Sequence, residues 1–174
     1  MTDQRNYDVV GVGALNLDYI HTVSRITLDG LERVLGSTVE AGGCSANATY
    51  ALARLGLRCG YLGAMRNDEE GELILNSFLS AGVDTQGIIR RADLRTGKVL
   101  ILSDAEGRRA MYLEPGASGL STAEQMPDAY LAGVRLLLLS SFNGEIDAQV
   151  QRVLLAALPQ KATLALILDG HLAQ

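Results

Sequence analysis

The sequence predicts an α/β fold with a mostly parallel sheet, helices on both of its faces, and a small second sheet beside it. Short apolar runs typical of buried strands alternate along the 174-residue chain with stretches of helical periodicity. Two further segments alternate apolar and polar residues on either side of a turn, a pattern that does not suit a sheet buried on both faces. We therefore expect these two hairpins to form an accessory sheet outside the main one.

The main sheet and its helices are predicted from apolar patterns and end signals. Apolar runs rich in Val, Leu and Ile predict buried strands at 7–15, 58–65, 134–142 and 163–170. Apolar residues at helical spacing predict helices over 45–55, 69–81 and 146–158. Gly56 and Gly82 are placed to end the first two helices, and Asp68 is placed to cap the start of the second.

The two hairpins are predicted from their turns. The first lies within 19–40 and turns at Asp29-Gly30, and we expect it to be antiparallel with one face in water. The second lies within 97–117 and turns at 104–107, which reads Asp-Ala-Glu-Gly. Because both are amphipathic, neither is assigned to the main sheet.

Composition excludes several classes of function. A net charge of −5 argues against a nucleic-acid partner, because binding a phosphate backbone needs a basic face. Cys44, Cys59, His21 and His171 have no metal-ligand spacing, so we expect no zinc site. No apolar run approaches the ~20 residues that cross a bilayer, and the N-terminus has no signal-peptide pattern. We predict a cytoplasmic protein without a membrane partner.

The segment GVGALN after the first strand resembles a dinucleotide-binding fingerprint only in part. Gly11 and Gly13 fit, but Asn16 stands at the third glycine position, and a hairpin rather than a helix follows. Asn16 and Asp18 are spaced to point to the same side of an extended segment. An amide beside a carboxylate suits the binding of neighbouring hydroxyl groups, and it is equally typical of a plain turn.

The segment AGGCSANATYALARLG at 41–56 has no lysine after its glycines and is therefore not a Walker A phosphate loop. Gly42 and Gly43 permit backbone angles closed to other residues, and they also allow a close approach to a ligand. Asn47 lies near the positive end of the predicted helix, where it could contact a ligand or act as an ordinary cap-region residue.

These segments occur in a fixed order with familiar spacing. Together they resemble the N-terminal half of the ribokinase-like (PfkB) family of carbohydrate and nucleoside kinases, from about Tyr7 to Asp169. The blocks that carry the resemblance are GALNLD, AGGCSANATYALARLG, YLGAMRNDEEGELILNSFLSAGVD and TGKVLILSDAEGRRAMYLEPGASGLS. The resemblance implies a Rossmann-like sheet with flanking helices and a small β-sheet lid over the substrate. Lid strands are then expected at about 18–41 and 88–113.

The resemblance implies a function and a set of binding residues. Members of the family use ATP and Mg²⁺ to phosphorylate a hydroxymethyl group of a sugar or nucleoside, and the lid forms a homodimer interface in several of them. By resemblance, the substrate-binding residues are Asn16, Asp18, Gly42, Gly43, Asn47, Val99, Ile101 and Phe142. Phe142 and Cys44 differ from ribokinase proper, which has Glu and Lys there, and both weaken an assignment to ribose. Arg66 stands where the family usually has Gly.

The glycine-rich loop that carries the family's catalytic aspartate has no counterpart in the chain. Residues 1–174 are therefore expected to be the N-terminal portion of the domain, with the base and the ATP and Mg²⁺ sites in a missing half. The apolar run of the last predicted strand ends at Leu168, six residues before the last residue given, as expected of an unfinished sheet. The chain alone is expected to be inactive. The alternative hypothesis is a non-catalytic sugar-binding or dimerising module.

Overall fold

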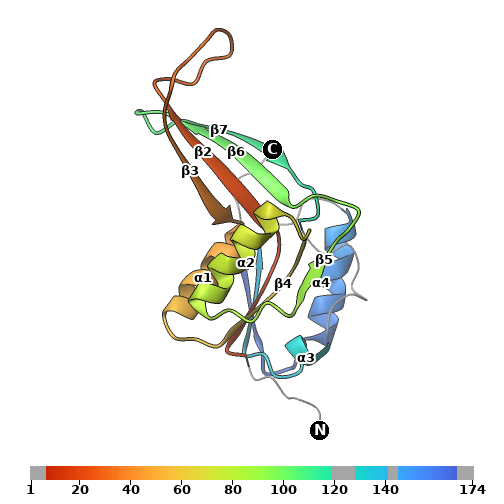
Figure 1. Ribbon diagram of the computed structural model, residues 1–174. Helices are drawn as coiled ribbons and strands as arrows, with labels where there is room; N and C mark the ends of the chain where they lie inside the picture. The colour runs from red at the N-terminus through yellow and green to blue at the C-terminus, as the bar shows by residue number, and fades with distance from the viewer. Residues whose placement is uncertain (1–6, 119–127, 141–144, 168–174) are drawn as a thin grey trace.

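Two sheets form the framework of the chain in the computed structural model, which describes residues 7–118, 128–140 and 145–167 (Figure 1). The main sheet has the strand order β5-β4-β1-β8-β9, and its pairings are all parallel. Its strands are β1 (Val9–Val12), β4 (Cys59–Met65), β5 (Ile88–Arg90), β8 (Leu136–Ser140) and β9 (Thr163–Ile167). The predicted α/β class is confirmed.

Helices cover both faces of this sheet, as predicted. On one face lie α1 (Cys44–Arg54) and α2 (Glu69–Ala81), and on the other lie the short α3 (Asp128–Leu131) and α4 (Glu145–Ala157). The helix ends follow the sequence signals: Gly82 takes a left-handed conformation with φ 81° after α2, and Gly56 has φ 92° after α1. Because helices cover both faces, the buried core has two parts, one on each face of the main sheet.

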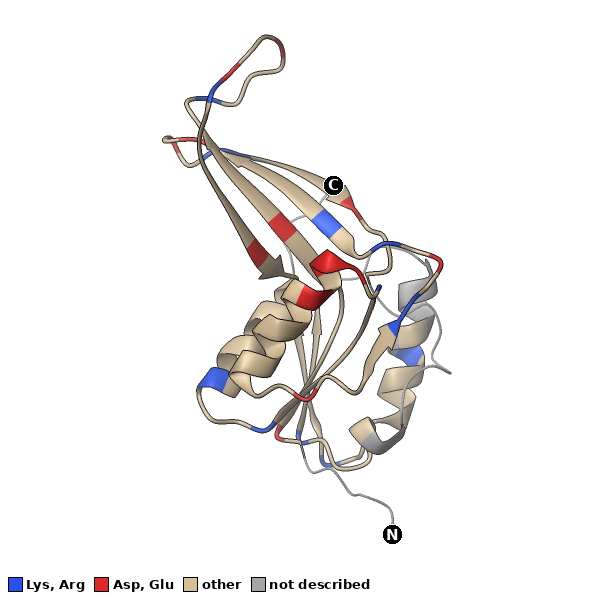
Figure 2. Cartoon of the chain, viewed as in Figure 1, with Lys and Arg blue, Asp and Glu red and all other residues tan. Residues whose placement is uncertain are grey.

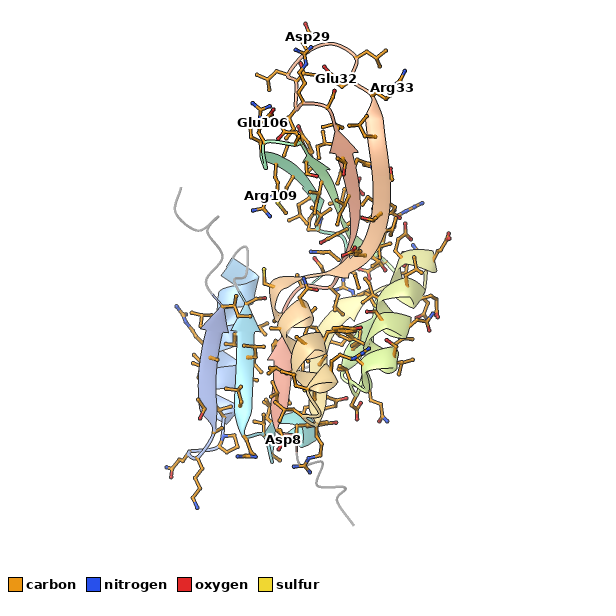
Figure 3. The ribbon with its side chains drawn as sticks, turned by 90° about the vertical axis from the view of Figure 1, so that its left-hand side faces the viewer. Asp8, Asp29, Glu32, Arg33, Glu106 and Arg109 are labelled. Atoms are coloured by element: carbon orange, nitrogen blue, oxygen red, sulfur yellow. The ribbon has the colours of Figure 1, made fainter. Side chains whose placement is uncertain are left out.

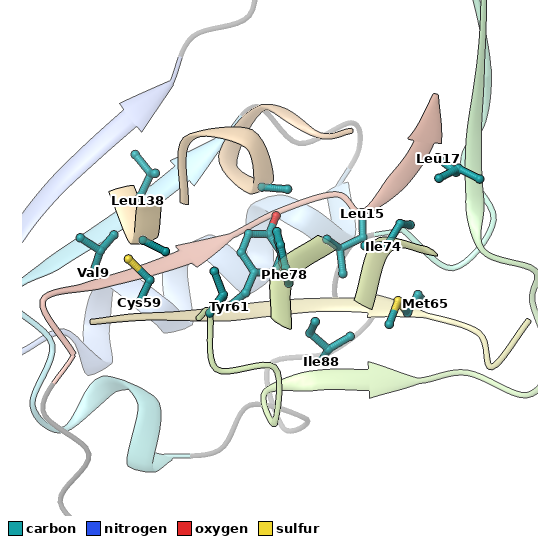
Figure 4. Packing of buried hydrophobic residues seen from close by; sticks show 13 residues of the cluster. Val9, Leu15, Leu17, Cys59, Tyr61, Met65, Ile74, Phe78, Ile88 and Leu138 are labelled. Carbon is teal, nitrogen blue, oxygen red and sulfur yellow. The ribbon is translucent and has the colours of Figure 1, made fainter. Parts of the chain in front are cut away.

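Successive residues of β1 point to opposite faces of the sheet and therefore pack into different halves of the core. Val9 packs with Tyr61, Leu138 and residues of α2, whereas Val10 and its neighbours Val12 and Leu137 pack toward α3 and α4. Figure 4 shows the first of these clusters, in which the Phe78 ring of α2 meets the Tyr61 ring at a centroid distance of 5.0 Å. This alternation is what a parallel strand buried on both faces requires.

The second sheet has the order β3-β2-β6-β7 and contains both predicted hairpins. Its strands are β2 (Asn16–Val23), β3 (Val34–Gly42), β6 (Gly97–Ser103) and β7 (Arg109–Glu114). Within each hairpin the strands are antiparallel, and β2 pairs with β6 in parallel. The sheet projects from the α/β body, with the hairpin tip around Asp29 far from Asp8 at the start of β1 (Figure 3).

Two details of this sheet differ from the sequence prediction. The expected lid range 88–113 begins too early, because Ile88–Arg90 pairs with Gly63–Met65 in the main sheet. A strand of three residues is too short to show a pattern in the sequence, and its place follows from its pairing with β4 and from the burial of Ile88 in the main core. In addition, the first hairpin does not have a single wet face: residues 34–40 of β3 are exposed on both sides, including Leu35 at 61%.

Asp68 caps α2 as predicted and also ties this helix to the second sheet. Its carboxylate accepts hydrogen bonds from the Gly71 N–H at 3.0 Å, the Thr96 N–H at 3.1 Å and the Thr96 hydroxyl at 2.5 Å. Thr96 is 1% exposed and immediately precedes β6. One carboxylate thus fixes both the start of a helix and the base of a strand.

We expect Asp68→Ala to lower the free energy of unfolding by roughly 2–3 kcal/mol, because it removes a helix cap and leaves buried Thr96 without its acceptor. Urea denaturation measures the change. Asp29→Ala at the exposed hairpin tip is the control and should change stability by less than about 0.5 kcal/mol. Equal effects of the two substitutions would contradict the role assigned to Asp68.

Candidate functional site

Of the predicted site residues, Asn16, Gly42 and Gly43 lie where the second sheet joins the carboxyl edge of the main sheet. The chain passes from β1 into β2 through Gly13–Leu15, and from β3 into α1 through Gly43. The register of the second sheet puts Asn16 opposite Gly42 and Gly97. Ligand sites of open α/β sheets form at this edge.

Four predicted side chains share one face of the second sheet. Asp18 pairs with Val99 across β2 and β6, and Ile101 lies two residues further along β6, opposite Ile20. Because alternate residues of a strand point to the same side, Asn16, Asp18, Val99 and Ile101 lie on a common face. The sequence spacing predicted this for the first two, and the strand register adds the others.

Asn16 has a buried acceptor that the protein leaves without a partner. The residue is 8% exposed, and its Oδ1 has no hydrogen bond within the described part of the chain. A Cβ atom at Gly97 would lie 2.3 Å from this oxygen, so the space beside it exists only because residue 97 is glycine. An unpaired buried acceptor costs free energy, which a ligand hydroxyl group could recover.

Asp18 shows the same feature in a charged group. Its Oδ1 is buried without a hydrogen-bond partner among the described residues. Burial, and secondly the nearby Glu40 carboxylate, raise the pKa of Asp18 to about 6. A Cβ atom at Gly42 would lie 2.2 Å from Asp18 Oδ2, so this glycine makes room for the carboxylate. Asp18 Oδ1 could therefore accept a hydrogen bond from a ligand donor.

A groove of about 670 Å³ opens beside Asp18, between the second sheet and helices α1 and α2. Asn47 of α1 is exposed and lines it together with Asp18 and Gly42. The complete lining is Leu17, Asp18, Val39, Glu40, Ala41, Gly42, Ala46, Asn47, Tyr50, Leu73, Ile74, Ser77 and Phe78. This volume is in the range of pockets for small molecules, and the lining combines apolar side chains with a few polar groups.

The backbone conformation at position 43 requires glycine. Its φ of 116° is in a region that favours glycine, and a Cβ atom there would lie 2.3 Å from the carbonyl oxygen of Ala14. The two predicted glycines therefore differ: Gly42 accommodates a side chain, and Gly43 allows β3 to turn into α1.

The structure does not bring every predicted residue to the groove. Asn16, Val99 and Ile101 are absent from its lining although they share a face with Asp18, and Val99 is 7% exposed. Phe142 lies outside the described residues. Gly97, Thr96 and Glu40 were missed by the sequence analysis, because their proximity to Asn16, Asp68 and Asp18 follows from strand pairing.

A buried polar network fixes the start of α1, and sequence reasoning did not predict it. The Ser45 and Tyr61 hydroxyls lie 2.7 Å apart, Tyr61 donates to the Ala14 carbonyl at 3.1 Å, and Ser140 donates to Ser45 at 3.2 Å. Burial raises the pKa of Tyr61, so the phenol stays protonated and can donate. Gly13 is the sequence feature that could have indicated this network, because a Cβ atom there would lie within 2.5 Å of both serine hydroxyls.

Charge is distributed unevenly around the site. Acidic positions lie side by side on β2 and β3, and a basic position follows on β6 (Figure 2). The described residues contain no group of three or more His, Cys, Asp or Glu side chains that could hold a metal ion. No helix within the described ranges is long and apolar enough to cross a membrane.

These features define a class of protein: a parallel α/β domain with a groove of small-molecule size beside a second sheet. Comparison with known proteins makes the class specific. The model of a family described as pfkB family carbohydrate kinase matches residues 6–173, and the chain belongs to this family.

Individual relatives agree with this assignment. The chain is 32% identical over 123 residues to a ribokinase from Staphylococcus aureus, covering 70% of this chain and 40% of the relative. It is 29% identical over 120 residues to fructokinase-1 from Zea mays, covering 68% and 36%. A crystal structure of fructokinase with bound ATP from Xylella fastidiosa superposes with a TM-score of 0.74 at 25% identity, covering 94% of this chain and 52% of that one. The chain spans less than half the length of these curated relatives.

Proposed function

We propose that the chain supplies the substrate-binding part of a kinase that transfers a phosphoryl group from ATP to a hydroxymethyl group of a sugar or nucleoside. The observation that carries this proposal is the pair of buried, unpartnered acceptors, Asn16 Oδ1 and Asp18 Oδ1, at the carboxyl edge of the sheet. Neighbouring hydroxyl groups are the donors that such a pair accommodates. Membership of a carbohydrate kinase family supports the same chemistry.

Each predicted residue has a role in this proposal. Asn16 and Asp18 accept hydrogen bonds from substrate hydroxyl groups, and Asn47 contacts the substrate from the start of α1. Val99 and Ile101 form an apolar wall on the same face. Gly42 and Gly43 allow the close approach of backbone and side chains at this point and form the joint between lid and body. The position of Phe142 in this scheme stays a prediction.

ATP supplies the phosphoryl group in this scheme, and Mg²⁺ would neutralise its charge. The described residues do not offer a carboxylate cluster for the metal, so we assign the ATP and Mg²⁺ sites and the catalytic base to other residues. We further propose that the chain alone binds sugar without transferring phosphate. A cytoplasmic location stays a prediction.

The second sheet acts as a lid in this proposal and forms a homodimer interface. Large apolar side chains exposed on its strands favour such a contact, among them Leu35, Val39, Leu100, Met111 and Tyr112. Their exposure follows from the open position of the sheet beyond the body (Figure 1).

Calorimetric titration of the chain with ribose, fructose and adenosine tests the proposed function. We expect at least one of them to bind, and Asn47→Ala to weaken that binding by roughly tenfold through loss of a hydrogen-bonding amide. Asn76→Ala is the matched control, because Asn76 is exposed on α2 outside the groove. Binding of none of the three, or equal weakening by both substitutions, would overturn the proposal.

A further inference from the structure

A second carboxylate stands directly beside Asp18. Glu40 of β3 is its cross-strand partner in the antiparallel pair with β2, and both residues line the groove. Directly opposite residues of such a pair have Cβ atoms about 5 Å apart. Figure 2 shows the two acidic positions side by side at the lower part of the second sheet. Glu40 is exposed, and its side chain forms no ion pair or hydrogen bond with another residue of the described ranges.

No positive charge in the lining offsets these carboxylates. None of the residues that line the groove is Lys, Arg or His. The side chains that α1 and α2 contribute beside Asp18, such as Asn47, Tyr50 and Ser77, are uncharged.

Lys98, which is next to Val99 on β6, already forms an ion pair with another residue. Lys98 on β6 forms an ion pair with Glu70 of α2, and the Tyr19 hydroxyl donates to the same carboxylate. Lys98 and Tyr19 lie on the face of the sheet opposite to Asp18, together with Leu17 and Val39, and neither Lys98 nor Tyr19 lines the groove. Both influences on the Asp18 carboxyl, burial and Glu40, oppose its charge.

We infer that Glu40, acting with Asp18, sets the charge specificity of the groove and excludes sugars that carry a negative charge. The inference rests on the proposed function and adds a substrate class to it: neutral or amine-bearing polyols, in preference to sugar acids and sugar phosphates. Exclusion by an uncompensated like charge is a general route to specificity. Asp18 accepts the hydroxyl group, and Glu40 supplies the repulsion.

Paired probes that differ in charge test this inference on the whole chain. Wild-type protein and Glu40→Gln are titrated at pH 8 and low salt with ribose and ribonate, with fructose and gluconate, and with glucosamine. We expect the wild type to bind the neutral sugar at least about tenfold more tightly than the acid. Glu40→Gln should reduce that ratio by roughly tenfold, because one of two charges is removed at short range.

Glu72→Gln is the matched control, since Glu72 is exposed on α2 and does not line the groove. An unchanged ratio in Glu40→Gln, or tighter binding of the acid by the wild type, would overturn the inference while leaving the proposed function intact. Binding of no neutral sugar at all would instead overturn the proposed function, and with it the inference.

A measurement without ligand gives an independent reading. Removing the Glu40 charge should lower the apparent pKa of Asp18, which the carboxyl carbon resonance follows in an NMR titration. Asn16 and Val99, the described neighbours of Asp18 on its own face, are uncharged, so Glu40 is the charge that the titration reports. An identical Asp18 titration in Glu40→Gln would show that the two carboxylates are too far apart to act together.

Discussion

Asp18→Asn is expected to stabilise the fold at pH 8 and to weaken sugar binding at the same time. The pKa of Asp18 is raised to about 6 in the folded chain, so the folded state holds this proton more tightly than the unfolded state does. The corresponding stabilisation is present at low pH and is lost as the pH rises through 6. At pH 8 the carboxylate is charged and partly buried, and Asn removes that cost, which we put at roughly 1–2 kcal/mol after solvent screening.

Urea denaturation at pH 5 and pH 8 measures the first effect, and calorimetry measures the second. The gain in stability should be larger at pH 8 than at pH 5, while the affinity for sugar falls by about tenfold to a hundredfold through loss of a charged acceptor. Asp29→Asn at the exposed hairpin tip serves as the control for both. A loss of stability of similar size at both pH values would contradict the buried, uncompensated state of Asp18.

Gly43→Ala is expected to be the most destabilising of the single substitutions considered. The new methyl group would meet the Ala14 carbonyl oxygen at 2.3 Å, and the backbone would also be strained by its φ of 116°. Neither group can move freely, because Gly43 joins β3 to α1 and Ala14 joins β1 to β2. We expect a loss of roughly 3–5 kcal/mol in the free energy of unfolding.

Gly56→Ala separates backbone strain from steric overlap. Gly56 has a φ of 92°, and no atom lies within 4 Å of the position that its Cβ would take. This substitution should cost about 1 kcal/mol. Thermal melts of the two variants give the comparison. If they lost stability equally, the close contact between residue 43 and Ala14 would have no energetic importance.

Local signals predicted most of the secondary structure correctly. The Asp68 cap, the end of α2 at Gly82 and the turn at Asp104–Gly107, where the Gly107 N–H donates to the Asp104 carbonyl at 3.0 Å, depend on residues close in sequence. Such features are encoded in a few neighbouring residues and are visible without tertiary information. The pairing of β2 with β6 is not, because the two strands lie about 80 residues apart and their register comes from packing.

The candidate site likewise combines features that local sequence predicts with features that depend on strand pairing. The common orientation of Asn16 and Asp18 follows from a spacing of two in a strand, and the sequence predicted it. The opposition of Asp18 and Glu40 depends on the register of the hairpin, which includes an irregularity between Thr22 and Val23. The requirement for glycine at position 97 depends on which side chain the neighbouring strand presents. These contacts could not be predicted from local patterns.

The second sheet is attached to the α/β body at one end only. Its connections through Gly13–Leu15, Gly43 and Thr96 all lie at the base, whereas the tip around Asp29 projects away from the α/β body (Figure 3). Gly13, Gly43 and Gly97 all lie at this base. An eight-residue strand is roughly 26 Å long, so a rotation of the sheet by about 10° about its base would carry the far end through about 5 Å. Changes too small to disturb the body could thus open or cover the groove.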